Sequence, residues 1–258
     1  MTAVRKFWPL LTGTYTYDKS ISTRNRGMGT KIEAPILAYL IETTQGRILY
    51  DVGCDYRKID DPALRARYYG HLPFPPPDMP DDHRLPARLR TLGLDPHDID
   101  LVFLGHLHFD HAGGLHDFAH ADIHVHAAER IAADEPGARG YFPDDFAADY
   151  RWRLQNGEYD LVPGVTAIES PGHTAGHMSM LIERPHGAPI LLCGDAADLV
   201  ENLEHEIAPG LCYRDDEDAA LASIRALKSR ACACGAHLWP NHDLDFFRTQ
   251  DRFPQWLE

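Results

Sequence analysis

The feature that most constrains this chain is the segment 106–114, which reads His-Leu-His-Phe-Asp-His-Ala-Gly-Gly. Residues two apart on an extended chain point to the same side, so His106 and His108 can direct two imidazoles at one cation. Asp110 and His111 follow after the turn begins and can reach a second cation nearby. Imidazole together with carboxylate suits zinc or a neighbouring first-row metal better than calcium or magnesium. The spacing therefore predicts a metal site, and it favours a hydrolytic enzyme.

The surroundings of this segment strengthen the prediction. An apolar, strand-like stretch at 99–104 precedes it, and the glycine pair at 113–114 allows the backbone to bend tightly behind the ligands. A lone His-x-His pair would mean little, because the chain contains 16 histidines in 258 residues. Four potential ligands directly after a strand are far more specific than such a pair. The alternative interpretation is a solvated, histidine-rich loop.

Four ligands cannot complete two metal sites, so further ligands should lie downstream. Three segments offer them, each with a His or Asp just after an apolar strand-like run, where open sheets usually assemble their sites. They are the loop 170–177 (Ser-Pro-Gly-His-Thr-Ala-Gly-His), the run 189–195 that ends in Gly-Asp, and the stretch 238–243 (Leu-Trp-Pro-Asn-His-Asp).

With these motifs in this order, the chain resembles the metallo-β-lactamase superfamily and, within it, the bacterial N-acyl-homoserine lactonases, which are quorum-quenching enzymes. The resemblance extends over roughly residues 30 to 245 and rests on the 106–114 segment, on Gly194-Asp195-Ala196, on the Glu201-Asn202 pair and on overall length. The fold that it implies is α/β, an αββα sandwich of two mixed β-sheets flanked by helices. We expect residues 1–258 to form a single domain of this kind, with the metals at one edge.

The resemblance also implies a ligand set for two divalent metal ions. The ligands of the first metal would be His106, His108 and His173. Those of the second would be Asp110, His111 and His242, and Asp195 would bridge both. Zinc is the expected metal, with manganese, iron and cobalt as alternatives. His177 is expected to have a structural or supporting role and not to bind metal.

Two such ions would lower the pKa of a bound water toward ~7 and so supply a nucleophile at neutral pH. The implied reaction is attack of a metal-bridging hydroxide on the carbonyl of a lactone or another carboxylic ester, with ring opening to a hydroxy acid. Asp110 is the candidate to pass a proton to the leaving oxygen. Phe109 lies within the ligand loop, where it can either line the substrate pocket or pack in the core.

One position departs from the family pattern. Lactonases of this family usually carry a Tyr three residues after the bridging Asp, and here that position is Asp198. A carboxylate donates a hydrogen bond only when it is protonated. Either another donor takes over, with Tyr213 as the nearest downstream Tyr, or the substrate differs and Asp198 selects a more polar lactone or ester.

Other functions fit the chain less well. A glyoxalase-II-like thioester or ester hydrolase shares the ligand set, but it usually shows Gly-Cys-Gly-Arg after the bridging Asp, where this chain has Ala-Ala-Asp-Leu at 196–199. A non-catalytic metal-binding protein would not need to retain the whole ligand set. The net charge of −14, from 25 Lys plus Arg against 39 Asp plus Glu, argues against a nucleic-acid partner.

The rest of the sequence indicates the cellular location and the partners to expect. No stretch approaches a membrane span, and the apolar part of the N-terminus is too short for a signal peptide. Five cysteines, an odd number, do not form a secreted disulfide framework, and Cys232 and Cys234 are interpreted as buried or helix-end thiols. We therefore expect a cytoplasmic enzyme with a small-molecule lactone or ester substrate. A homodimer is expected only because similar lactonases often dimerise.

Hydrophobic periodicity and turn residues predict a coarse map of elements. Residues 36–42 and 47–51 should form a hairpin, and residues 70–82, which include five prolines, should form an irregular loop. A helix is expected at 84–92, and a strand running into a helix at 125–134. The clearest helix is 215–230, whose acidic start and basic end suit the helix dipole.

Overall fold

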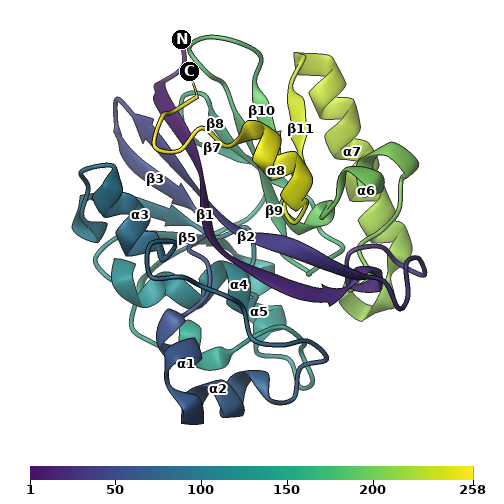
Figure 1. Cartoon of the computed structure of the whole chain (residues 1–258). Helices are drawn as coiled ribbons and strands as arrows, with labels where there is room; N and C mark the ends of the chain where they lie inside the picture. Colours follow the sequence, from purple (N-terminus) through teal and green to yellow (C-terminus); the bar gives the residue numbers. More distant parts are fainter. Residues whose placement is uncertain (258) are drawn as a thin grey trace.

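Two β-sheets form the centre of the structure, a computed structural model that describes residues 1–257 (Figure 1). The strands of the first sheet, in spatial order, are β1 (Val4–Asp18), β2 (Lys31–Thr43), β3 (Gly46–Tyr50), β4 (Leu101–Phe103), β5 (Asp122–His126) and β6 (Arg151–Gln155). Those of the second sheet are β11 (His237–Trp239), β10 (Ile190–Leu192), β9 (Met178–Ile182), β8 (Val165–Glu169) and β7 (Tyr159–Val162). Both sheets contain parallel and antiparallel pairs.

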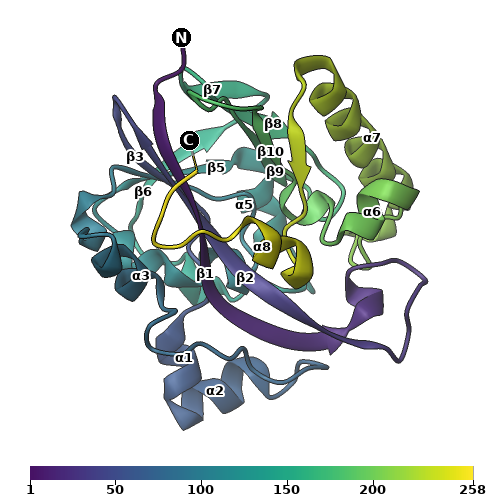
Figure 2. The ribbon, with the colours of Figure 1, turned by 45° about the horizontal axis from the view of Figure 1, so that its top comes forward.

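Helices cover the outer faces of the two sheets, with α3 on one side and α6 and α7 on the other (Figure 2). The α-helices are α1 (Tyr56–Asp60), α2 (Pro62–Tyr69), α3 (Leu85–Thr91), α4 (Phe109–Ala112), α5 (Ala127–Ala133), α6 (Val200–His205), α7 (Glu217–Cys234) and α8 (Leu244–Gln250). Short 3-10 turns occupy Lys19–Ile21, Pro96–Asp98, Gly113–Phe118, Pro143–Asp145, Gly194–Ala196 and Tyr213–Asp215. Among residues 1–257, no helix is both long and apolar enough to span a bilayer.

The apolar core is divided into layers that follow from the sheets. Between the two sheets, Tyr50 and Phe103 of the first pack in one cluster with Met180 and Trp239 of the second. A second cluster lies under α3, whose Leu89 packs with residues of β3, β4 and β5. A third joins α7 to the second sheet. Because burying one large apolar side chain contributes about 1.5–3 kcal/mol, these layers stabilise the sandwich. The arrangement confirms the predicted αββα architecture.

The N-terminal part of the first sheet is longer than predicted. The hairpin of β2 and β3 is confirmed, with Thr43 opposite Gly46 at its turn. However, β2 begins at Lys31, because β1 pairs with it along nearly its whole length, from Val4 opposite Thr43 to Asp18 opposite Lys31. This pairing supplies a partner for residues 31–35 that the local pattern did not reveal.

The predicted loop and helices are confirmed, with two corrections. Residues 70–82 contain no helix or strand, and the helices at 85–91 and 127–133 lie where expected. Helix α7 extends one turn beyond the predicted end and stops at Gly235, whose φ of +68° suits the left-handed cap. Its last turn therefore contains no basic residue, so the predicted basic end is wrong. Cys232 and Cys234 lie in that turn and are exposed, so they are helix-end thiols but not buried ones.

Candidate metal centre

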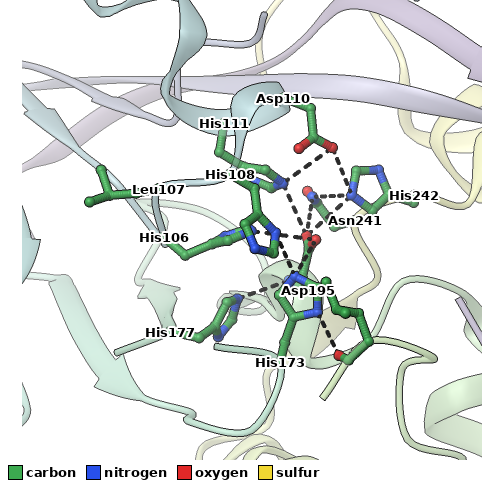
Figure 3. Close-up of polar contacts among 12 residues, drawn as sticks. His106, Leu107, His108, Asp110, His111, His173, His177, Asp195, Asn241 and His242 are labelled. Carbon is green, nitrogen blue, oxygen red and sulfur yellow. Dashed lines mark hydrogen bonds and ion pairs between the residues drawn. The ribbon is translucent and has the colours of Figure 1, made fainter. Parts of the chain in front are cut away.

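Four loops that follow strands converge at one edge of the sandwich. The 106–111 loop comes after β4, His173 after β8, Asp195 after β10 and His242 after β11. Figure 3 shows the side chains of these loops directed toward one another around Asp195. The glycine pair permits the close approach behind the first loop. A Cβ on Gly114 would lie 2.3 Å from the Val52 carbonyl oxygen, and one on Gly113 would meet backbone atoms at 2.4 Å.

Asp195 occupies the centre and presents one carboxylate oxygen to each side (Figure 3). Its Oδ2 lies 3.3 Å from His173 Nε2 and 3.7 Å from His106 Nε2. Its Oδ1 lies 3.2 Å from both His111 Nε2 and His242 Nε2. One carboxylate therefore faces two separate sets of imidazoles.

Each set is completed by one further buried side chain. His108 joins the first, with its Nδ1 3.0 Å from His173 Nε2. Asp110 joins the second, with its Oδ2 3.7 Å from His111 Nε2 and 3.8 Å from His242 Nε2. In each set the candidate donor atoms lie within 4.8 Å of one another. We refer to His106, His108 and His173 with Asp195 as the first group, and to Asp110, His111 and His242 with Asp195 as the second group.

The donor atoms suit divalent cations. Neither nitrogen of the buried His106 has a hydrogen-bond partner, and His111 Nε2 also lacks one. Buried polar atoms normally find a partner, because leaving one unpaired costs about 1–3 kcal/mol. Since these nitrogens and the carboxylate oxygens converge, a cation between them would satisfy both kinds of atom. Imidazole and carboxylate are donors for zinc and other first-row metals.

The electrostatics agree with this chemistry. Burial, together with the neighbouring histidines, holds the pKa of His106 and His108 well below the ordinary value, so both imidazoles are neutral and can donate a lone pair. Burial also acts to lower the pKa of His242, but the carboxylates around it, Asp195 first among them, raise it to about 9. The same balance raises the pKa of His111 well above its ordinary value. The carboxylates of the second group therefore stabilise positive charge at this position.

Hydrogen bonds from distant segments orient the second group. His111 Nδ1 donates to Asp51 Oδ2 at 2.6 Å, and His242 Nδ1 donates to the Pro35 carbonyl at 2.9 Å. Both bonds leave Nε2 to face Asp195, the arrangement by which an outer partner fixes a ligand's tautomer. Asp51 also accepts from the Gly105 amide and has a φ of +60°. Sequence reasoning missed Asp51, although an apolar strand ending in Asp is the signal that indicated Asp195.

A buried glutamate ties the two ligand loops of the first group together. Glu129 Oε1 accepts from the Leu107 amide at 3.0 Å and from the Tyr141 hydroxyl at 2.9 Å. Its Oε2 accepts from the Gly176 amide at 3.1 Å. Because Leu107 lies between two ligands and Gly176 follows His173, this carboxylate sets the spacing of the loops. Nothing in the local sequence around 129 indicated this role.

Two further polar residues reach the central carboxylates. The buried Tyr15 hydroxyl of β1 donates to Asp110 Oδ2 at 2.8 Å. Asn241 Nδ2 donates to Asp195 Oδ1 at 3.0 Å. His177 instead supports the backbone, since its Nε2 accepts from the Asp195 amide at 2.9 Å and its Nδ1 contacts Ser170. It lies outside both groups of candidate ligands.

An aromatic cavity of about 510 Å³ opens onto both groups, and both Asp198 and Phe109 line it. Phe109 also stacks on Phe142 with ring centroids 4.9 Å apart, so it packs in an apolar cluster as well as facing the cavity. Asp198 is 4% exposed, and burial together with the Asp195 charge raises its pKa to about 8. Tyr213 does not reach this cavity. It lines a neighbouring one beside His108 and His173, and its hydroxyl donates to Glu135.

Comparisons with known proteins agree with this geometry. The family profile described as "Metallo-beta-lactamase superfamily" matches residues 33–231. N-acyl homoserine lactonases from Bacillus sp and Bacillus cereus are 31% and 30% identical, and each alignment covers 98% of this chain and 99% of the relative. A solved N-acyl homoserine lactone hydrolase, with the product N-hexanoyl-L-homoserine at its catalytic metal centre, aligns over 100% of both chains at 29% identity and a TM-score of 0.89. The chain therefore belongs to the metallo-β-lactamase superfamily.

Proposed function

We propose that this protein is a metal-dependent lactonase that opens the ring of an N-acyl homoserine lactone or a closely related lactone. The observation that carries the proposal is the position of Asp195, which presents one oxygen to each of two buried groups of donors. Full-length similarity to N-acyl homoserine lactonases supports the substrate class.

In this proposal His106, His108 and His173 would hold one divalent ion. Asp110, His111 and His242 would hold the other, and Asp195 would contribute to both sites. Zinc is the metal that we expect first, because imidazoles dominate the donors. When bound, two such ions would lower the pKa of a water molecule and polarise the substrate carbonyl.

The chain's own residues then position the substrate and move a proton. Water adds to the lactone carbonyl carbon, the ring C–O bond breaks, and the leaving alkoxide takes a proton to give the hydroxy acid. Asp110 takes the proton that the attacking water loses and passes it to this oxygen. Its side chain is positioned for this step because the Tyr15 hydroxyl donates to its Oδ2 beside the second group. The aromatic cavity accepts the acyl chain and excludes bulk water. Its volume of about 510 Å³ lies within the usual range for small-molecule sites, roughly 300–1,000 Å³.

Metal analysis of the purified protein, paired with a substrate panel, tests the proposal. The panel contains acyl-homoserine lactones of several chain lengths, other lactones, a thioester and a cephalosporin. We expect two divalent ions per chain, hydrolysis of lactones in preference to the other substrates, and loss of activity on chelation with recovery on adding metal back. Fewer than two metals per chain would contradict the dinuclear centre, and a preference for the thioester would favour a glyoxalase-II-like activity.

Two predictions about the setting accompany this function. All five cysteines are free thiols, which suits a reducing compartment such as the cytoplasm. We further expect a homodimer, as in similar lactonases, and light scattering of the purified protein measures it directly.

A further inference from the structure

Asp198 lies beside the second group but is not among the ligands assigned above. One of its side-chain oxygens, one oxygen of Asp195 and one nitrogen of His242 all lie within 4.8 Å of one another, and all three residues are buried. The backbone fixes this arrangement, because the His242 amide donates to the Asp198 carbonyl at 2.8 Å and the Asn241 amide to the Ala197 carbonyl at 3.1 Å. Asp198 and His242 are thus held side by side, whatever their side chains bind.

One oxygen of the Asp198 side chain lacks the partner that a buried polar atom normally has. This oxygen, Oδ1, is buried and has no hydrogen-bond partner. The charged groups that act most strongly on Asp198 are Asp195, His242 and Asp110. A buried polar oxygen without a partner is costly, so such atoms normally find a hydrogen bond or bind a cation. An unpartnered oxygen on a side chain that lies against the donors of a metal site points to a cation as its partner.

We propose that Asp198 is an additional carboxylate ligand of the metal held by the second group. This inference rests on the proposed function, since it assumes that the second group binds a metal. The second metal would then have three carboxylates, Asp110, Asp195 and Asp198, with two imidazoles. The first would keep three imidazoles and one carboxylate. Oxygen-rich donor sets suit harder ions such as manganese, whereas imidazole-rich sets suit zinc. Asp198 therefore shifts the preference of the second position from zinc toward manganese.

The test compares metal binding of three variants with that of the unaltered full-length protein. Asp198→Asn keeps the size of the side chain but removes its charge. Glu201→Gln is the matched control, because it makes the same change in a neighbouring carboxylate that is paired with Lys19 outside the second group. His242→Ala removes a proposed ligand of the second metal. Metal-free samples of each are titrated with Mn(II), followed by the EPR signal of the free ion, and separately with Zn(II) by calorimetry.

We expect Asp198→Asn to weaken Mn(II) binding at one of two positions by about tenfold or more, with a smaller effect on zinc, and Glu201→Gln to change neither. Equal Mn(II) affinity in Asp198→Asn and the unaltered protein would overturn the inference. If His242→Ala loses one metal while Asp198→Asn binds normally, only the role of Asp198 fails. If His242→Ala still binds two metals, the ligand assignment of the proposed function fails, and the assignment of Asp198 fails as well. An altered KM with unchanged metal binding would instead assign Asp198 to substrate recognition.

Discussion

The two groups of candidate ligands are equally buried but differently supported. In the second group, His111 donates to Asp51 at 2.6 Å, His242 donates to the Pro35 carbonyl at 2.9 Å, and Asp110 accepts from Tyr15 at 2.8 Å. In the first group, His106 makes no hydrogen bond through either nitrogen. The second group is therefore oriented by direct hydrogen bonds from the first sheet and its edge.

Among the residues that the structure describes, the first group has only one such bond to a ligand imidazole, from His173, and it otherwise relies on hydrogen bonds to the backbone of its loops. His173 Nδ1 donates to the Leu211 carbonyl at 3.1 Å, and Glu129 joins the two loops through their backbone amides. The difference teaches that one metal centre can be built with two kinds of support. One acts mainly on the ligand side chains and the other mainly on the backbone that carries them. Each kind can be removed separately by substitution.

The largest effect is expected from removing a ligand of the second group. His111→Ala should lose the second metal, keep the first, and reduce kcat by about 10³-fold, because an electrostatic contribution to the transition state disappears. Metal stoichiometry and steady-state kinetics measure both results. Retention of two metals would show that the groups are not independent.

Removing support from the second group should have the next largest effect. Asp51→Asn can still accept from His111, and Asn tolerates the positive φ at this position. The loss of charge should weaken metal binding about 10–100-fold, and at the second position only. Asp100→Asn is the control, because Asp100 accepts from the Arg47 amide at the far end of β3. Equal weakening of both metals would contradict the comparison between the two groups.

A substitution at Glu129 tests the hydrogen bonds that support the backbone of the first group. In Glu129→Gln the side-chain NH2 cannot accept from an amide, so the bond to Leu107 or to Gly176 is lost. We expect the free energy of unfolding to fall by about 1–3 kcal/mol, as for a buried group left unpaired. Affinity for the first metal should fall more than for the second. Chemical denaturation and metal titration measure the two effects, and a selective loss of the second metal would refute the assignment.

The smallest effect is expected at Tyr15. Tyr15→Phe removes the hydrogen bond to Asp110 but keeps the ring, which packs against Tyr17 with centroids 4.7 Å apart. The hydrogen bond that orients Asp110 is expected to contribute about 1 kcal/mol, and its loss corresponds to a roughly fivefold lower kcat. KM and metal content should not change. Tyr17→Phe serves as the control, since its hydroxyl contacts Ser22 at 2.8 Å. A larger change in KM than in kcat would assign Tyr15 to substrate binding.

Much of the fold and most of the candidate ligands could be predicted from the sequence, because their signals are local. The spacing of His106, His108, Asp110 and His111 follows from the geometry of a strand and its turn. The hairpin of β2 and β3 and the position of α3 follow from periodicity and turn residues. Even so, the end of α7 was missed, because a helix continues until a residue such as Gly235 permits the left-handed cap.

The supporting residues could not be predicted, because they act across long sequence distances. Asp51 is 60 residues from His111, and Tyr15 is 95 residues from Asp110. Only the pairing of β1, β2, β3 and β4 in one sheet brings these residues to the same edge. For the same reason, the sequence suggested Tyr213 as a donor to the substrate because it is the nearest downstream Tyr, whereas the structure places Tyr213 in a neighbouring cavity and Tyr15 in the cavity that Asp198 lines.

The sequence by itself determined which donors this protein offers and which segments carry them, because local spacing and strand ends depend on neighbouring residues alone. Their local spacing did not indicate how these donors are grouped. A grouping was implied by the family resemblance, and the distances that decide it come from the tertiary structure. It divided them around Asp195, assigned a distant partner to His111 and His242, and placed Asp198 against the second group with an unpaired oxygen. The physical reason is that strand pairing and the packing of two sheets determine the distances between loops, and no local pattern contains those distances.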